Sequence, residues 1–277
     1  MSMTPLTLFV KRLFKPDEID ISKEMKMRVN AVLFDLFDTL LLVNGGDAFY
    51  EPALQKLHNF LVENGVKVTF EEFKRLYFDV RDSLYLETAE TLDEPHFNVR
   101  LLRTLKRLGY NFEVSNPIII GGTKTFGEEF MRHVSLDEDA VDVLQKLYGK
   151  YKLGIVSNLS IPECAWQLLE KFDLKKYFDV IVLSGDVNRR KPSPEIFQKA
   201  LKALNIKASE TIFIGDTLSI DIKGAKNIGI NAILIKRKTS LTDSPKSLIW
   251  SPKEETQIKP DKIITSLKEL LALLEDC

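Results

Sequence analysis

The chain has 277 residues, of which 44% are hydrophobic and 29% are charged, and its 39 Lys and Arg residues balance 40 Asp and Glu residues to a net charge of −1. This composition is typical of one large or two modest globular domains, and the balanced charge argues against nucleic acid or an anionic membrane as the main partner. The two cysteines, Cys164 and Cys277, are too few for a disulfide framework, and no apolar run approaches the ~20 residues of a membrane span, so we expect a soluble, cytoplasmic protein.

Residues 1–28 precede the first predicted strand. Their short apolar patch, residues 6–10, comes before Lys11 and Arg12, whereas a signal peptide carries its positive charge ahead of a longer apolar stretch. We therefore expect an N-terminal extension that is frayed or packs as a helix, with amphipathic membrane contact as the alternative.

Five short apolar runs are typical of buried strands, and a segment with apolar residues three or four apart, typical of a helix, precedes each of the last four. This alternation predicts an α/β protein with a parallel sheet and helices on both faces. The predicted strands are residues 30–36, 151–157, 180–183, 211–215 and 232–235, and the predicted helices are residues 137–148, 162–172, 194–204 and 220–228. A polar surface loop, residues 240–260, is expected before a last strand (262–264) and helix (267–274).

One interval, from Phe49 to His133, shows helical spacing and no clear buried strand. We interpret it as a helical insert between the first strand and the rest of the sheet. Gly45–Gly46 and the region near Ser135 are candidate hinges. Gly121–Gly122 is expected to be a turn inside the insert, because it lacks the strand-then-helix setting of a phosphate-binding loop.

Four of the five predicted strands end in polar residues or are followed by them. The first strand ends in Asp35, followed by Asp38 and Thr39, and the second ends in Ser157 and Asn158. Lys191 follows the third strand in the segment RRKPSPEIF, and Asp216 and Asp221 follow the fourth. Ligands bind at the carboxyl ends of parallel strands, so we expect these groups to meet at one edge of the sheet.

Three carboxylates at that edge would repel one another. Two like charges 4 Å apart cost ~4 kcal/mol at an effective dielectric constant near 20, and Lys191 alone does not compensate Asp35, Asp216 and Asp221. A hard divalent cation does, and oxygen ligands beside a phosphate favour Mg²⁺. Such a site suits a carboxylate that attacks phosphorus and forms an aspartyl-phosphate, which water then cleaves.

Four motifs together resemble those of the haloacid dehalogenase superfamily, in the same order and spacing. They are FDLFDTL at 34–40, IVSN at 155–158, the lysine of RRKPSPEIF, and GDTLSID at 215–221. The resemblance implies a Rossmann-like core of residues 29–46 and 135–277 and a helical cap of residues 47–134.

The resemblance also assigns roles to single residues. It implies that Asp35 is the nucleophile and a metal ligand, and that the Phe37 carbonyl, Asp216 and Asp221 also face Mg²⁺. It implies that Ser157, Asn158 and Lys191 grip the phosphate, with Thr39 as a further candidate. The implied activity is that of a phosphatase acting on a small phosphorylated molecule, with no nucleic-acid or membrane partner.

The chain departs from the superfamily's phosphatases two residues after the nucleophile. In the phosphatases of this superfamily, that position carries a second aspartate, which is the general acid for the leaving group. The present chain has Phe37 there, followed by Asp38. In an extended chain, positions i and i+2 share a side but i+3 points away. Asp38 serves as acid and base only if the loop turns it back. Without a general acid, activated esters such as aryl phosphates should be the better substrates.

Two other readings stay open. Dehalogenases of the superfamily resemble this chain in having an aromatic residue at the Phe37 position. However, they use an arginine soon after the first motif and need no metal, whereas no arginine occurs here between Asp35 and Arg75. The second alternative is a catalytically reduced protein that only binds a phosphorylated ligand.

Overall fold

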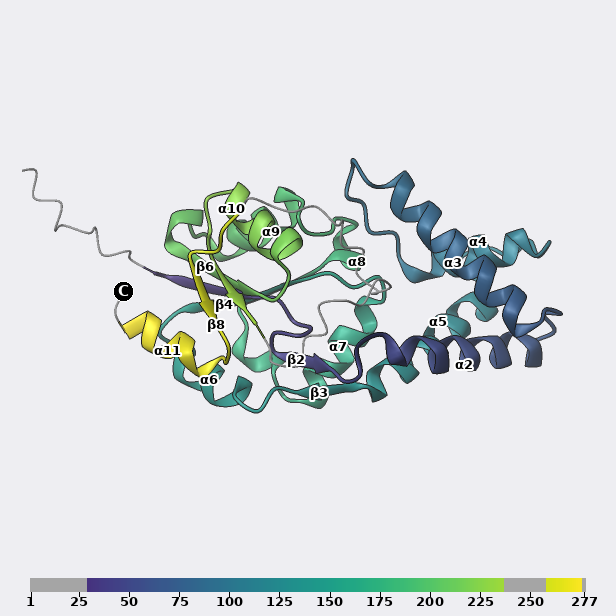
Figure 1. Ribbon diagram of the computed structural model, residues 1–277, viewed down its shortest axis with the longest axis horizontal. Coiled ribbons are helices and arrows are strands. Elements are labelled where there is room, and N and C mark those ends of the chain that lie inside the picture. Colours follow the sequence, from purple (N-terminus) through teal and green to yellow (C-terminus); the bar gives the residue numbers. More distant parts are fainter. Residues whose placement is uncertain (1–28, 237–257, 276–277) are drawn as a thin grey trace, which may run out of the picture.

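The computed structural model describes residues 29–236 and 258–275 (Figure 1). A six-stranded sheet forms its core, in the order β5-β4-β1-β6-β7-β8, and every neighbouring pair of strands is parallel. The strands are β1 (Ala31–Phe34), β4 (Lys152–Ser157), β5 (Val180–Leu183), β6 (Thr211–Gly215), β7 (Asn231–Ile235) and β8 (Lys262–Ile264). They fall on the five predicted apolar runs and on the predicted last strand at 262–264, so the predicted α/β fold class is confirmed.

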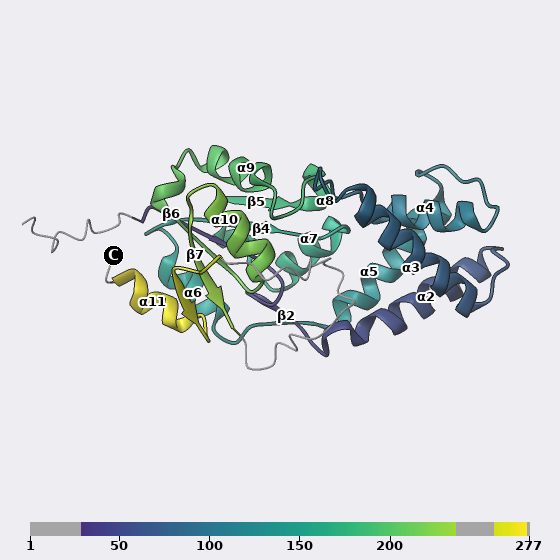
Figure 2. The ribbon, with the colours of Figure 1, turned by 45° about the horizontal axis from the view of Figure 1, so that its top comes forward.

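Helices cover both faces of this sheet (Figure 2). Alternate residues of β1 point to opposite sides: Val32 and Phe34 belong to one apolar cluster, and Leu33 belongs to a second. The first cluster includes residues of α6 (Ala140–Leu147), α7 (Pro162–Lys171) and α11 (Lys268–Glu275). The second includes residues of α9 (Pro194–Leu204) and α10 (Lys223–Asn227). Two-sided burial explains why the strands are continuous apolar runs.

Four helices form a cap between β1 and β4: α2 (Tyr50–Glu63), α3 (Phe70–Glu87), α4 (Phe97–Arg107) and α5 (Pro117–Arg132). In Figure 1 the cap extends to the right of the sheet. The chain passes into it through β2 (Leu41–Val43) and a short 3-10 turn (Gly46–Phe49) and leaves it through β3 (Val134–Leu136). β2 and β3 pair antiparallel. This pair was not predicted, because three residues are too few to show a period.

Gly121–Gly122 was predicted as a turn, and this prediction is wrong: both glycines lie inside α5. A side-chain carbon on Gly121 would lie 2.5 Å from the Phe60 ring, and one on Gly122 would lie 2.9 Å from Leu57. The glycines therefore allow α5 to pack closely against α2.

The helix predicted at residues 220–228 begins two residues earlier than expected, and with a different hydrogen-bond pattern. Leu218–Ile222 forms a π-helical turn, and α10 continues from it. The predicted extension 1–28 and residues 240–257 of the predicted surface loop lie outside the described residues. Among the helices of the described ranges, none is both long and apolar enough to cross a membrane.

Candidate active site

The carboxyl ends of the three central strands bring the predicted site residues together. Asp35 directly follows β1, and its backbone N donates to Ile214 O of β6 over 2.8 Å. Phe34 lies in register with Ile155 of β4 on one side and with Ile214 on the other. Ser157 ends β4, so the residues that follow these three strands share one edge of the sheet.

Asp35, Asp216 and Asp221 form an acidic cluster in which one carboxylate oxygen of each lies within 4.8 Å of those of the others. Asp35 and Asp221 are buried, and Asp216 is half-buried. Within residues 29–236 and 258–275, this is the group of acidic, His and Cys side chains close enough to share a metal ion. The expected convergence of these three residues is therefore present.

Local backbone structure places Asp221 in the cluster. A side-chain carbon on Gly215 would lie 2.5 Å from Asp221 Cγ, so only glycine leaves space for this carboxylate at the end of β6. Thr217 N donates to Asp221 Oδ2 over 2.9 Å, which fixes the side chain across the π-helical turn. The bend after β6 thus returns Asp221 toward the strand that it follows.

Burial and mutual repulsion disfavour the charged forms of these acids. Burial raises the pKa of Asp35 from 3.8 to about 6; Lys191 opposes this shift and Asp221 adds to it. Burial also raises the pKa of Asp216 well above its usual range, and the nearby carboxylates of Asp221, Asp35 and Asp38 raise it further. The cluster is short of positive charge, as the sequence suggested.

Lys191 is the cation inside this site. It is buried, and its Nζ lies 2.6 Å from Asp35 Oδ1 and 2.7 Å from Asp221 Oδ1. Burial alone would lower the pKa of Lys191, but the carboxylates of Asp221 and Asp35 raise it above its ordinary value. Lys191 therefore stays charged between two acids.

The side-chain amide of Asn158 bonds the backbone of Lys191 and does not point into open space. Its Oδ1 accepts from Lys191 N over 2.8 Å, and its Nδ2 donates to Lys191 O over 3.1 Å. Ser157 differs: its hydroxyl is buried and has no well-aligned hydrogen bond within the described residues. That hydroxyl nevertheless lies near enough to Asp35 to lower the carboxyl's pKa slightly. Thr39 is also fully buried in the loop after β1.

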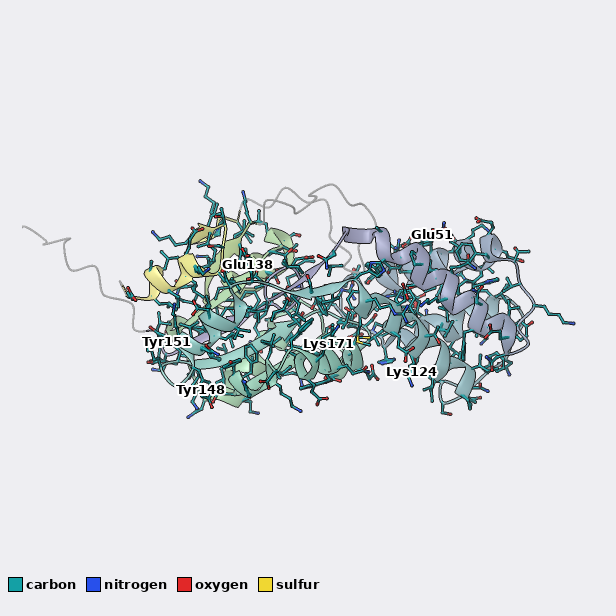
Figure 3. All side chains as sticks on the ribbon, turned by 90° about the horizontal axis from the view of Figure 1, so that it is seen from below. Glu51, Lys124, Glu138, Tyr148, Tyr151 and Lys171 are labelled. Atoms are coloured by element: carbon teal, nitrogen blue, oxygen red, sulfur yellow. The ribbon has the colours of Figure 1, made fainter. Side chains whose placement is uncertain are left out.

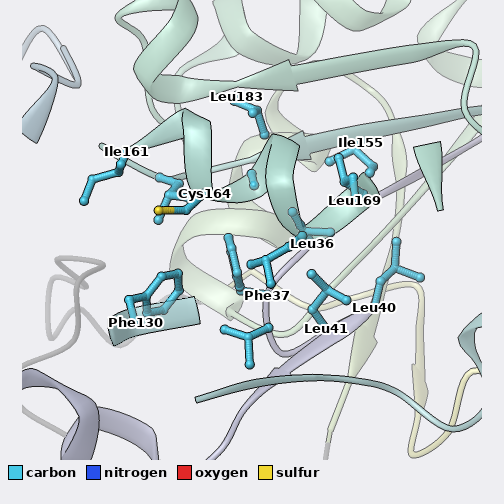
Figure 4. Packing of buried hydrophobic residues seen from close by; sticks show 14 of the residues in the cluster. Leu36, Phe37, Leu40, Leu41, Phe130, Ile155, Ile161, Cys164, Leu169 and Leu183 are labelled. Atoms are coloured by element: carbon cyan, nitrogen blue, oxygen red, sulfur yellow. The ribbon is translucent and has the colours of Figure 1, made fainter. Parts of the chain in front are cut away.

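Phe37 and Asp38 occupy the loop that follows Asp35. The Phe37 ring is buried and packs 5.5 Å from the ring of Phe130, at the end of α5 (Figure 4). Asp38 has φ of 54°, in the left-handed region, so its side chain does not follow the extended alternation. Its Oδ1 accepts from Val43 N over 3.1 Å, and its charge also acts on Asp216.

Arg190 is only 4% exposed, although it stands in the polar segment RRKPSPEIF. Its guanidinium donates to Thr88 Oγ1 over 2.8 Å and to Thr88 O over 3.0 Å, and its backbone N donates to Leu92 O over 2.8 Å. Both partners lie in the segment between α3 and α4, beside α8 (Ser184–Val187) in Figures 1 and 2. The residue before Lys191 thus joins the core to the cap, which the polar segment RRK did not indicate.

A separate hollow of about 290 Å³ lies between α5 and α7, and its lining contains none of the predicted site residues. It is lined by Glu128, Met131, Arg132, Gln167 and Lys171. Figure 3 shows Lys171 beside the junction of core and cap. The strand ends, not this hollow, collect the acidic side chains.

The model of the haloacid dehalogenase-like hydrolase family matches residues 32–235. The match spans β1 to β7 and contains all four strand-end motifs. The chain belongs to this family. This member of the family carries Phe37 two residues after Asp35.

Among curated relatives, the chain is 29% identical to the glyceraldehyde 3-phosphate phosphatase of Methanothermobacter thermautotrophicus over 245 residues, which are 88% of this chain and 100% of the relative. It is 30% identical to the glyceraldehyde 3-phosphate phosphatase of Pyrococcus abyssi over 75% of this chain and 82% of the relative. A solved structure, the 2-haloacid dehalogenase of Pseudomonas syringae, superposes with a TM-score of 0.65 at 22% identity, covering 89% of this chain and 98% of that one. The structural likeness shows the shared fold, and the chain is homologous to phosphatases.

The acidic cluster fits a hard divalent cation. Its donors are three carboxylates, which such ions prefer, and burial together with the neighbouring carboxylates raises the pKa of Asp35 and of Asp216. Lys191 already bonds Asp35 and Asp221, so Asp216 is the acid of the three that it does not contact within 4.0 Å. A cation bound by these oxygens would neutralise that remaining charge.

Proposed function

We propose that the protein is a phosphatase that hydrolyses a small phosphate monoester through an aspartyl-phosphate on Asp35. The contact between Asp35 and Lys191 carries this proposal: a buried carboxylate lies 2.6 Å from a buried ammonium. One carboxylate oxygen is held in place by this bond, and Lys191 supplies positive charge where phosphate oxygens would lie.

In the first step, an Asp35 carboxylate oxygen forms a bond to phosphorus while the ester bond to the leaving oxygen breaks. The Lys191 ammonium and the buried hydroxyl of Ser157 donate to the phosphoryl oxygens. Asn158 acts through Lys191, whose backbone it holds on both sides. Thr39, in the loop after Asp35, is a further candidate ligand of the phosphate.

In the second step, water attacks phosphorus and the bond to Asp35 breaks, which releases phosphate and restores the carboxylate. We assign the proton transfers to Asp38, which protonates the leaving oxygen and then accepts a proton from water. Its proximity to Asp216 supports this role, because it places Asp38 on the acidic side of the loop despite the preceding Phe37.

Asp35, Asp216, Asp221 and the backbone carbonyl of Phe37 are the proposed ligands of Mg²⁺. When bound, the ion would screen the carboxylates from the anionic phosphate and polarise the phosphoryl group. Glyceraldehyde 3-phosphate is the first substrate to test, because two relatives carry its name.

The test measures phosphate release from 4-nitrophenyl phosphate and glyceraldehyde 3-phosphate with and without Mg²⁺. We expect turnover that a chelator stops and that Asp35→Asn lowers by at least ~10³-fold. The control is Asp142→Asn, an exposed acid on α6 that pairs with Lys146. Phosphate binding without turnover, or metal-independent halide release from 2-chloropropionate, contradicts the proposal.

A further inference from the structure

Three cap side chains form a buried basic cluster that the proposed chemistry does not use. Arg100 of α4, Arg81 of α3 and Tyr50 of α2, here called the cap cluster, are 4%, 9% and 5% exposed. The Tyr50 hydroxyl lies near enough to both guanidinium groups for each of them to lower its pKa, which burial raises. Three separate helices thus direct hydrogen-bond donors to one place.

Each member of the cap cluster has a buried polar atom without a hydrogen-bond partner in the described parts of the chain. These atoms are Arg100 Nε, Arg81 Nη1 and the Tyr50 hydroxyl oxygen. Arginine nitrogens only donate, so two of the three atoms need an acceptor. Buried donors without acceptors are rare and costly in folded proteins, which points to an acceptor that the chain itself does not provide.

The charge of the cluster is also poorly compensated. Arg100 makes no ion pair with an acid of the described residues; its Nη1 donates instead to the Tyr77 hydroxyl over 3.1 Å. Within the described ranges Arg81 pairs only with Asp82, which is largely exposed. The buried Glu94 acts on Arg100 but is shared with Arg190. Buried water would satisfy the donors but would not neutralise the charge, so an anion fits better.

Two contacts connect the helices of the cap cluster to the part of the core that holds the catalytic residues. At the start of α4, Phe97 N donates to Ser160 O, two residues after Asn158, over 2.9 Å. The guanidinium carbons of Arg100 and Arg190 lie 5.6 Å and 5.3 Å from the centre of the same Tyr85 ring. Arg190 directly precedes Lys191, so the ring of Tyr85 connects the two positive regions.

A second set of contacts leads from the nucleophile loop to the cluster. The ring of Phe37 packs on Phe130 at 5.5 Å, Phe130 on Phe49 at 5.1 Å, and Phe49 on Tyr50 at 4.9 Å. These four buried rings form one continuous apolar layer from the loop after Asp35 to the cap cluster. A substrate whose phosphate lies at Asp35 would extend from there toward the cap.

We propose that Arg100, Arg81 and Tyr50 bind a second acidic group of the substrate, so that the protein prefers phosphate monoesters that also carry a carboxylate or a second phosphate. This inference rests on the proposed phosphatase function. Guanidinium groups match such groups through paired N–H donors, and a neutral substrate would leave these donors without partners.

The experiment uses two matched pairs of substrates. The two members of a pair differ in one acidic group, and the two pairs differ in the length of the carbon chain. They are 3-phosphoglycerate with glycerol 3-phosphate, and 6-phosphogluconate with glucose 6-phosphate. We expect kcat/KM to be higher for the acidic member of at least one pair by roughly 10- to 100-fold. Arg100→Gln should remove this preference, and Tyr50→Phe, which keeps the ring, should reduce it several-fold through KM.

The matched control is Arg103→Gln, an exposed arginine on the same helix that pairs with Glu87. Its substrate preference should equal that of the unaltered protein. If both pairs are hydrolysed without preference, or if Tyr50→Phe lowers activity on acidic and neutral members equally, the inference is wrong. Arg100→Gln risks poor folding, and Tyr50→Phe then decides the result.

Binding separates this inference from the proposed function. Calorimetry with Asp35→Asn protein in Mg²⁺ measures the dissociation constants of the same compounds without turnover. Tighter binding of an acidic member that Tyr50→Phe weakens supports the cap cluster even if no phosphate is released by the unaltered protein. Equal dissociation constants in both pairs overturn the inference, whereas the phosphatase proposal stands if glycerol 3-phosphate is hydrolysed.

Discussion

Asn158 and Lys191 are bonded twice across 33 residues of sequence: the amide oxygen of Asn158 accepts from Lys191 N, and its amide nitrogen donates to Lys191 O. Both polar atoms of the Asn158 side chain are therefore used to fix the backbone of Lys191. This unit carries the ammonium that contacts Asp35 and Asp221. The amide after β4 therefore sets the position of the lysine, and the lysine sets that of the nucleophile.

Asn158→Ala should weaken both stability and catalysis. It leaves a buried backbone N–H and C=O of Lys191 without partners, so we expect the free energy of unfolding to fall by about 1–3 kcal/mol. Because Lys191 is no longer held, kcat should also fall, by roughly 10-fold or more. Urea unfolding and steady-state kinetics measure the two effects. The control is Asn59→Ala, an exposed position on α2, and an unchanged kcat in Asn158→Ala contradicts the positioning role.

Metal removal should change stability in a pH-dependent way. An acid whose pKa is higher in the folded protein than in the unfolded chain stabilises the fold at a pH below the unfolded-state pKa. This stabilisation is lost as the pH rises through the folded-state pKa. For Asp35 this window runs from 3.8 to about 6, so the metal-free protein loses stability across it. Mg²⁺ needs the ionised carboxylates. We expect it to raise Tm by several degrees near pH 7.5 and by less near pH 5.

Differential scanning fluorimetry with Mg²⁺ or a chelator measures this effect. At a concentration of ~100 Kd, a ligand stabilises by about 2.7 kcal/mol. Asp216→Asn should abolish the shift, and Asp142→Asn should keep it. A shift of the same size at both pH values would show that ionisation of the cluster does not control metal binding.

Asp38→Asn should reveal whether Asp38 transfers protons. A general acid typically contributes ~10²- to 10⁴-fold, and a good leaving group needs it least. We therefore expect a large loss of kcat on glycerol 3-phosphate and a much smaller loss on 4-nitrophenyl phosphate. If both rates fall equally, Asp38 does not transfer protons but shapes the site, for example through its bond to Val43 N and its charge near Asp216. In that case the unaltered protein should itself favour aryl phosphates.

Arg190→Met should loosen the cap. The change removes the guanidinium bonds to Thr88 Oγ1 and Thr88 O and leaves the buried Glu94 with less positive charge nearby. Hydrogen exchange in residues 88–94 should become faster, and stability should fall by about 1–3 kcal/mol. Arg107→Met, at an exposed position on α4, is the control. Unchanged exchange in residues 88–94 would show that Arg190 does not hold the cap.

Much of the fold could be predicted because the sheet is buried on both faces. Each strand is then a short apolar run, as in residues 211–215, and the polar residue after it marks the carboxyl end. The convergence of Asp35 with Asp216 followed from parallel strand order alone. β2 and β3 were missed because residues 41–43 pair with residues 134–136 on the far side of the cap, which no local pattern shows, and Gly121–Gly122 was misjudged because a glycine pair shows flexibility but not which neighbour needs the space.

The site was only partly predictable for a related reason. The sequence by itself determined which side chains reach the edge of the sheet, since chain order and strand length are local properties. Only the tertiary structure decided that Asn158 bonds Lys191, that Arg190 is buried against the cap, and that Arg100 bonds the Tyr77 hydroxyl instead of an acid of the described residues. Burial and pairing depend on segments far apart in the chain, and a polar residue looks the same in sequence whether water or another helix surrounds it.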